Sequence, residues 1–308
     1  MEDIQDQEAH NLEIINHIAF EFLGGKKNAK TQRLGGGSCN DNYLVEVPDK
    51  KIVVRMSKPH REYKALFEYK KEAWCIGKSH QLQIPVSKVF EVGQWDDRAY
   101  MIQSYVEGFI PSGAQTLPVW EKLGEYAQKI HSIAVTGWGE NLTEEGVFDA
   151  SWEKYVQYNI NSLNGNDPLI AMDILTGRLS KEIKSLFERV QAQKFKFGLC
   201  HGDIALRNTL VNSEGIIYLL DWGCARAEVV PHYDINEILL SSKPDESALQ
   251  AFLAGYGISQ GEFEDMKADL NVLLLLHKVD TLRWAIDKKP EEIPRVVADV
   301  KEVLGKCF

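Results

Sequence analysis

The segment from residue 200 to residue 223 constrains the fold of this chain more than any other stretch. It contains two short apolar runs on either side of a glycine-containing turn. Apolar runs joined in this way pair as an antiparallel hairpin. With a turn centred between Ser213 and Glu214, Asn208 lies roughly opposite Leu219. The segment therefore predicts a hairpin whose open end carries polar side chains.

The open end of this hairpin brings oxygen-bearing side chains together. Asp221 lies near the base of the first strand, close to Asn208, and Asp203 lies on the loop that leads into that strand. Hard oxygen donors that converge on one point suit Mg²⁺, which takes one or two protein ligands together with phosphate oxygens. Phosphoryl transfer needs such ligands and an aspartate that accepts the hydroxyl proton. The pattern therefore predicts a phosphotransferase site.

The rest of the chain divides into a strand-rich part and a helix-rich part. The first part reads as an antiparallel meander with one helix over residues 61–77, after a helical N-terminal extension. We therefore expect an α+β fold with two lobes, residues 1–104 and residues 105–308. The second lobe is expected to contain helices over residues 117–133, 151–163, 167–192, 246–256, 262–286 and 291–304.

Charge and cysteine usage exclude several classes of function. The whole net charge of −10 falls on residues 101–308, since residues 1–100 are neutral. A negative field attracts cations and repels nucleic acid, although it also serves solubility. The five cysteines are widely spaced without a Cys-x-x-Cys pair, so neither a zinc cluster nor a disulfide framework is expected. An acidic start and the lack of a long apolar run predict a cytoplasmic protein that binds no membrane.

The hairpin segment is similar to a known family. His201, Gly202 and Asp203, followed by Asn208 and by an apolar strand that ends in Asp221, resemble the aminoglycoside phosphotransferase and choline kinase-like family, which is related to the protein kinases. The resemblance implies a protein-kinase-like bilobal fold with a small antiparallel sheet in the first lobe. It implies ATP or GTP as donor, Mg²⁺ bound by Asn208 and Asp221, and Asp203 as catalytic base.

The resemblance also assigns supporting roles around this loop. His201 would support the loop, and Asp234, at the end of a Pro-x-Tyr-Asp match, would buttress it. His131 matches a recurrent structural histidine of the family.

Residues of the first lobe resemble the family's nucleotide site. The glycine-rich turn with Gly36, Gly37 and Ser38 resembles a phosphate-covering loop, because glycine lets backbone approach phosphates without a Cβ clash. Arg55 stands where protein kinases carry a lysine that contacts the phosphates, and Lys51 is the alternative.

The partner of that cation is expected on the following helix. Glu72 matches the family's glutamate, and Glu68, one helical turn earlier, is the alternative. The hinge between the lobes, where backbone groups would bond the nucleotide base, is expected at Gln103, Ser104 and Tyr105. Because backbone groups would make these bonds, ATP and GTP both remain open as donors.

The acceptor is expected to be small. Gly202 replaces the arginine of protein kinases. Only residues 223–233 separate the predicted metal ligand Asp221 and Trp222 from Asp234, which leaves no room for an activation loop. Carboxylates with an aromatic ring bind amines. The candidates are Glu228, Glu237, Asp280, Trp284 and Asp287, although the last three also fit a solvated helix face.

These inferences predict a monomeric or weakly dimeric small-molecule kinase with a cationic acceptor and no nucleic-acid partner. An aminoglycoside, and hence antibiotic resistance, is the first interpretation. A metabolic kinase for choline, an amino alcohol, a sugar or a macrolide is the second. A nucleotide-binding pseudoenzyme is the third.

Overall fold

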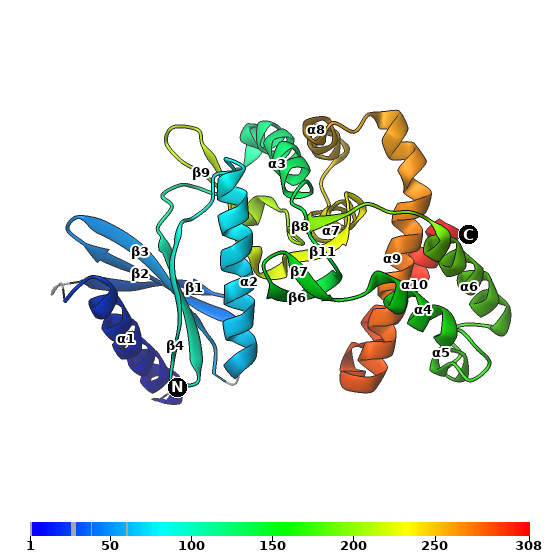
Figure 1. Cartoon of the computed structure of the whole chain (residues 1–308), viewed down its shortest axis with the longest axis horizontal. Helices are drawn as coiled ribbons and strands as arrows, with labels where there is room; N and C mark the ends of the chain where they lie inside the picture. Colours follow the sequence, from blue (N-terminus) through cyan, green and yellow to red (C-terminus); the bar gives the residue numbers. More distant parts are fainter. Residues whose placement is uncertain (1, 26–28, 38, 60) are drawn as a thin grey trace. The chain divides into compact units, whose positions relative to one another are not determined.

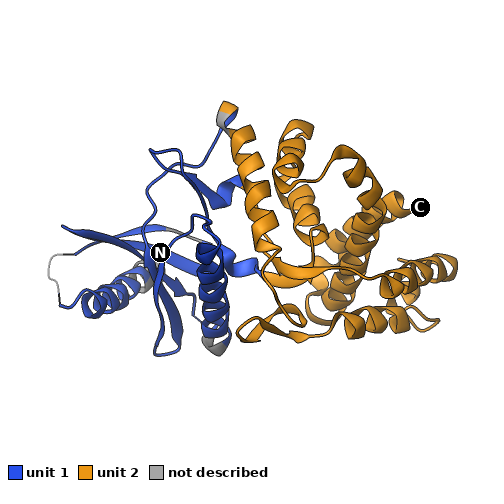
Figure 2. Ribbon diagram, turned by 45° about the horizontal axis from the view of Figure 1, so that its top comes forward, with its two compact units in different colours: residues 1–113, 206–225 blue, residues 114–205, 226–308 orange. Residues whose placement is uncertain are grey.

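The computed structural model describes residues 2–25, 29–37, 39–59 and 61–308. The chain forms two compact units, shown in different colours in Figure 2. Unit 1 comprises residues 1–113 and 206–225, and unit 2 comprises residues 114–205 and 226–308. The lobe boundary after residue 104 stays a prediction. Among the described residues, no helix is long and apolar enough to cross a membrane.

Unit 1 is built on a five-stranded antiparallel sheet in the order β1-β2-β3-β5-β4. The strands are β1 Lys30–Gly36, β2 Asn40–Val47, β3 Lys50–Ser57, β4 Val89–Trp95 and β5 Arg98–Ser104. Because side chains alternate along a strand, Ile102 packs under helix α1, Glu2–Phe22, while Met101 packs under helix α2, Glu62–Gln81. The two helices therefore cover opposite faces of the sheet (Figure 1).

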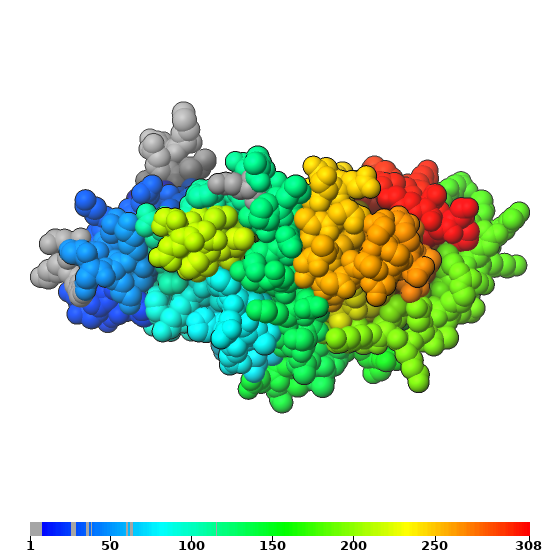
Figure 3. Space-filling model, turned by 90° about the horizontal axis from the view of Figure 1, so that it is seen from above, coloured from blue at the N-terminus to red at the C-terminus, as the bar shows by residue number. Residues whose placement is uncertain are grey.

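The predicted hairpin forms within unit 1, and its turn is exposed (yellow-green in Figure 3). It consists of β9, Thr209–Val211, and β10, Ile217–Leu219. Its register differs by one residue from the expected one, because Leu219 pairs with Thr209 rather than with Asn208. The cause is Asn212, whose Oδ1 accepts hydrogen bonds from two backbone N–H groups of the turn. These bonds favour a longer turn than apolar spacing alone indicates.

Unit 2 is mainly helical, which confirms the predicted α+β class. Its helices are α3 Thr116–Ile130, α4 Trp152–Ser162, α5 Pro168–Ala171, α6 Gly177–Ala192, α7 His232–Glu237, α8 Glu246–Tyr256, α9 Gln260–Lys288 and α10 Ile293–Cys307. One π-helical turn, η4, Ile238–Ser242, follows α7. The prediction of a single helix over residues 167–192 is wrong, since α5 and α6 are separate helices. The second begins after Thr176, whose side chain caps α6 by accepting a hydrogen bond from the N–H of Leu179.

A four-stranded sheet in the order β7-β6-β11-β8 accompanies these helices. Its strands are β6 Trp138–Glu144, β7 Val147–Ala150, β8 Phe197–Cys200 and β11 Arg226–Val229. The sequence pattern does not predict β6 and β7. At the centre of the unit, α9 is contacted by α4, α6, α7, α8 and α10, and its four leucines at 273–276 are all buried. Four successive leucines cover every side of one helical turn, so this part of α9 is surrounded by other elements.

Two glycines let α3 and α8 approach closely. A Cβ added at Gly124 would overlap the carbonyl oxygen of Phe252, and one added at Gly255 would overlap that of Glu121. The backbones of the two helices therefore touch where side chains would normally separate them.

We expect Gly124→Ala to lower the free energy of unfolding by about 1–3 kcal/mol or more, since overpacking forces the helices apart. Gly261→Ala is the matched control, because a Cβ there meets no atom within 4 Å. This control should be neutral, or should stabilise by up to about 1 kcal/mol through helix propensity. Urea denaturation measures both. Equal stability of the two variants would contradict the close approach of α3 and α8.

Candidate functional site

Unit 1 contains a cavity of about 280 Å³ beside the hairpin. Its lining comes from β1, β2, β3, the end of β5 with the two residues after it, Ser87 before β4, and the open end of the hairpin. Residues predicted for nucleotide and metal binding line it together, namely Arg55, Gln103, Ser104, Tyr105, Asn208 and Asp221. The predicted Gly36 ends β1, and Gly37, which follows it, does not line the cavity. Ser38 lies outside the described residues.

Arg55 is the buried cation of this cavity. Its guanidinium donates a hydrogen bond to the Glu72 carboxylate, and its second terminal nitrogen lies 3.8 Å from Oδ1 of Asp221. Burial alone would lower the pKa of Arg55, but the carboxylates of Glu72 and Asp221 raise it overall. The cation is therefore permanent and is oriented by a helix that packs on the sheet.

The alternatives to this pair lie elsewhere in unit 1. Glu68 accepts hydrogen bonds from Arg61 at 2.8 and 2.9 Å, and Lys51 lies 3.4 Å from Glu46 on the surface. None of these residues lines the cavity. The tertiary structure thus shows that Glu72, and not Glu68, is the partner of Arg55, a choice that helical spacing alone leaves open.

Asp221 follows β10 with a left-handed backbone conformation, φ 58°. Aspartate tolerates this region better than most residues, and the side chain stays about half exposed at 56%. Just after it, the carbonyl oxygen of Gly223 accepts a hydrogen bond of 3.1 Å from the buried Lys71 of α2. Lys71, adjacent to Glu72, is a positioning residue that sequence reasoning did not assign.

Two further residues of the cavity were not assigned from the sequence. Asn42 on β2 has a buried Oδ1 that lacks a hydrogen-bond partner among the described residues. Arg207 is exposed and lies next to Asn208. Two sequence signals could have identified these residues. Asn42 follows the glycine turn, and Arg207 is adjacent to the predicted metal ligand Asn208.

The segment with Asp203 belongs to unit 2, where it is anchored to α7. Both oxygens of the fully buried Asp234 accept backbone hydrogen bonds, at 3.0 Å from His201 and 2.7 Å from Gly202. His131 lies 2.9 Å from the same carboxylate. Burial would raise the pKa of Asp234, but His131 and the N–H of Gly202 lower it overall. Asp203, in turn, donates its backbone N–H to Nδ1 of His201 at 3.2 Å.

The glycine at position 202 has a conformational reason. Its φ is 78°, which lies in the left-handed region that residues with a Cβ rarely adopt. The turn aims two successive N–H groups at Asp234, so Gly202 and Asp234 together fix the backbone that precedes Asp203.

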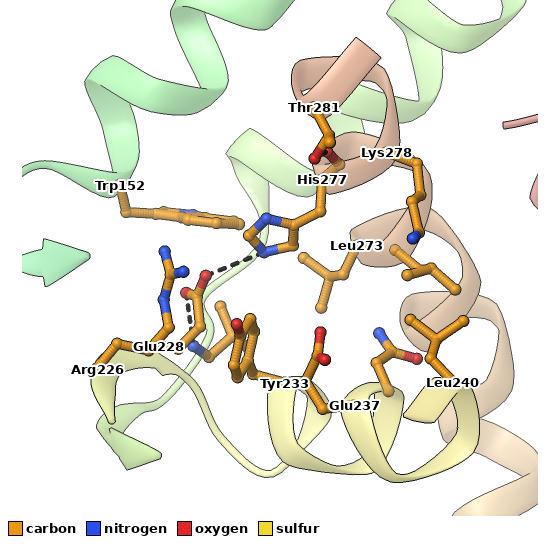
Figure 4. Close-up of a pocket in the computed structure, with 13 residues that line it drawn as sticks. Trp152, Arg226, Glu228, Tyr233, Glu237, Leu240, Leu273, His277, Lys278 and Thr281 are labelled. Atoms are coloured by element: carbon orange, nitrogen blue, oxygen red, sulfur yellow. Dashed lines mark hydrogen bonds and ion pairs between the residues drawn. The ribbon is translucent and has the colours of Figure 1, made fainter. Parts of the chain in front are cut away.

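Unit 2 holds a second cavity, of about 180 Å³, between β11, α7 and α9 (Figure 4). Two of the substrate candidates, Glu237 from α7 and Glu228 from β11, line it. The other residues of the lining include Trp152, Arg226, Tyr233, His277 and Lys278. Glu228 lies 3.0 Å from Nε2 of His277 and accepts hydrogen bonds from the Trp138 indole and the N–H of Val229. Burial raises the pKa of Glu237, and nearby His277 partly opposes the rise.

The other substrate candidates, Asp280, Trp284 and Asp287, do not line this cavity. Asp280 accepts a hydrogen bond of 3.2 Å from Asn159, and burial raises the pKa of Asp280. Trp284 is 47% exposed beneath the ammonium of Lys289. These residues therefore do not share a cavity with Glu237, and their substrate-binding role stays a prediction.

Comparisons with known proteins cover most of both units. A sequence model described as the phosphotransferase enzyme family matches residues 30–268. No curated protein matches the chain. Among solved structures, the aminoglycoside phosphotransferase APH(4)-Ia has a TM-score of 0.68 at 13% identity, covering 96% of this chain and 98% of that one.

Two other solved structures have similar folds. A thermostable mutant of APH(4)-Ia in ternary complex with AMP-PNP and hygromycin B has a TM-score of 0.67 at 14% identity, covering 95% of this chain and 98% of that one. Choline kinase LicA from Streptococcus pneumoniae has a TM-score of 0.62 at 16% identity, with the same coverage of 95% and 98%. The predicted kinase-like fold is thereby confirmed.

We expect Glu72→Ala to lower the free energy of unfolding by about 3–5 kcal/mol, because it leaves the Arg55 charge buried without its partner. Glu68→Ala should cost only about 0.2–1 kcal/mol, as for other partly exposed ion pairs. Chemical denaturation of both variants distinguishes the two glutamates. A larger loss for Glu68→Ala would show that Glu72 is not the buried partner.

The raised pKa of Glu237 predicts a pH-dependent gain of stability in Glu237→Gln. A carboxyl with a raised pKa favours the folded state at low pH, and this contribution is lost as pH rises from its ordinary pKa of 4.5 through the raised value. Above that window the wild type keeps a buried charge that glutamine lacks. At pH 8 the melting temperature of the variant should therefore lie a few degrees above that of the wild type, which corresponds to about 1 kcal/mol in the free energy of unfolding. At pH 4 the difference in melting temperature should be smaller. Thermal melts at both pH values test this, and a variant less stable at pH 8 would disprove it.

Proposed function

Because the chain belongs to the phosphotransferase enzyme family, we propose that it transfers the γ-phosphoryl group of ATP or GTP to a hydroxyl of a small cationic molecule. The nucleotide binds in the cavity of unit 1, and the acceptor is recognised by unit 2. The observation that carries the proposal is the buried Arg55–Glu72 pair beside Asp221 in a cavity that Asn208 also lines.

The electrostatics of unit 1 suit a triphosphate. Arg55 keeps its charge at every physiological pH, and a guanidinium contacts phosphate oxygens with two nitrogens at once. Residues 103–106 line the same cavity, at the segment where the base of the nucleotide is expected. The AMP-PNP complex of the similar APH(4)-Ia mutant supports a nucleoside triphosphate as donor.

The donor set of Asn208 and Asp221 fits Mg²⁺. A carboxylate that is about half exposed and a neighbouring carboxamide offer hard oxygen ligands, of which Mg²⁺ needs only one or two from protein. When bound, Mg²⁺ neutralises charge on the phosphate oxygens. Lys71 and Arg55 keep the Asp221 segment in place on the protein side.

Asp203 is assigned as the base that accepts the proton of the acceptor hydroxyl. The anchored segment before it supports this role, since His201 and Gly202 are held by Asp234 and cannot shift without breaking buried hydrogen bonds. General bases work when their geometry is fixed before the substrate binds.

The first candidate acceptor is an aminoglycoside. The hygromycin B complex of the APH(4)-Ia mutant and the net charge of −10 over residues 101–308 favour a cationic antibiotic. The likeness to choline kinase LicA favours a metabolic amino alcohol as the second candidate. Resistance of a sensitive bacterium that expresses the chain would support the first, and phosphorylation of amino alcohols would support the second.

Asp203→Ala is expected to lower turnover about 10²–10⁴-fold, which is the usual contribution of a general base. Asp221→Ala should abolish Mg²⁺-dependent turnover while the chain stays folded. A coupled assay that detects ADP or GDP, run with aminoglycosides and amino alcohols, measures both.

Asp265→Ala is the control, because this aspartate is exposed on α9 and lines neither cavity. It should keep wild-type turnover. Full activity of the Asp203 variant would refute the base, and nucleotide binding without turnover on any acceptor would favour a pseudoenzyme.

A further inference from the structure

The cavity of unit 2 is small for a ligand site. Its volume of about 180 Å³ lies below the roughly 300–1,000 Å³ that bury a drug-sized ligand. It would accommodate an amino alcohol or a single sugar ring. A trisaccharide antibiotic would have to leave most of its atoms outside.

One carboxylate of this cavity, that of Glu237, has no hydrogen-bond donor among the described residues, although the charges of Lys278 and Arg226 partly offset its own. Glu228, by contrast, accepts hydrogen bonds from the Trp138 indole and the N–H of Val229, while Lys278 donates to Asp299 at 3.0 Å rather than to Glu237. The carboxylate of Glu237 accepts no hydrogen bond from the described residues, and in Figure 4 it rises from α7 toward His277. A carboxylate in a cavity without a donor favours a ligand that brings one.

The remaining lining suits an ammonium donor. Trp152 adds an aromatic ring, whose face attracts cations, whereas the Tyr233 ring already lies 5.1 Å from the Arg226 guanidinium. The amide nitrogen of Asn236 donates to the carbonyl oxygen of Leu270 at 3.0 Å, which anchors this side chain beside the cavity.

The cavity also adjoins the segment that carries Asp203. Tyr233, Glu237 and Leu240 recur at the spacing of one helix face and line the cavity, while Asp234 on the neighbouring face holds the backbone of residues 201 and 202. At the end of η4, the Ser242 hydroxyl donates to the carbonyl oxygen of Ile204 at 3.2 Å. The segment formed by α7 and η4 thus contacts both the cavity and the backbone on either side of Asp203.

We propose that this cavity binds the acceptor through one primary ammonium group held by Glu237, and that the acceptor is a small monoamine with a hydroxyl group, either an amino alcohol or one amino-sugar ring. This inference rests on the proposed function and narrows its substrate class.

The charges of the lining argue for a single ammonium. Arg226 and Lys278 balance the formal charges of Glu228 and Glu237, so the cavity as a whole offers no net attraction to a polycation. The local attraction is at Glu237. A second ammonium would have to lie close to the lining cations, where like charges repel.

The test is calorimetric binding to the full chain, with glucosamine against glucose and ethanolamine against ethylene glycol. Each pair differs mainly by an amine in place of a hydroxyl. We expect at least one amine to bind at least tenfold more tightly than its neutral analogue, and Glu237→Gln to remove this preference. Equal binding within both pairs would overturn the proposal.

Glu188→Gln is the matched control, since it removes the same charge from an exposed position of α6 and should keep the amine preference. A thermal melt of each variant verifies folding. Loss of the preference in both variants would mean that overall charge, not Glu237, attracts the amine, and would also overturn the proposal.

Phosphorylation assays separate this inference from the proposed function. If the enzyme phosphorylates hygromycin B but neither binds nor phosphorylates the small amines, the inference fails and the phosphotransferase stands. If glucosamine or ethanolamine binds through Glu237 but no acceptor is phosphorylated, the proposed function fails. Amine binding that survives Asp203→Ala, with phosphorylation lost, supports both.

Discussion

The fully buried carboxylate of Asp234 organises the backbone segment that precedes Asp203 in unit 2. One of its oxygens accepts the N–H of Gly202, and the other accepts that of His201 and lies 2.9 Å from His131. A buried carboxylate without such partners would cost several kcal/mol. The segment before Asp203 and the core around α7 are therefore energetically coupled, and neither is stable in this form without the other.

Unit 1 uses a related arrangement around a buried cation. Successive residues of a helix point about 100° apart, so α2 contacts two different elements with neighbouring side chains. Glu72 holds Arg55 of β3, and Lys71 holds the carbonyl oxygen of Gly223. A single helix thereby orients both the cation of the cavity and the segment that follows Asp221.

The two cavities differ in how their charges are compensated. In unit 1 the buried Arg55 has its carboxylate partner already in place, which suits a ligand that adds further negative charge beside a metal. In unit 2 the Glu237 carboxylate faces a cavity without a hydrogen-bond donor to it among the described residues, at a cost in stability. Proteins keep such costs mainly where function requires them.

The sequence by itself determined what depends on neighbours along the chain. The hairpin, the α+β class and the family followed from residues 201–223 and from apolar periodicity, because strand pairing and helix faces are local properties. The register was missed by one residue, since side-chain hydrogen bonds of Asn212 set the turn. The family resemblance favoured Glu72 over Glu68 as the partner of Arg55, and the tertiary structure shows that pair. Only the tertiary structure decided that Glu237 rather than Asp280 lines a cavity. Helical spacing shows which residues share a face, but the element that packs against that face is set by contacts distant in sequence.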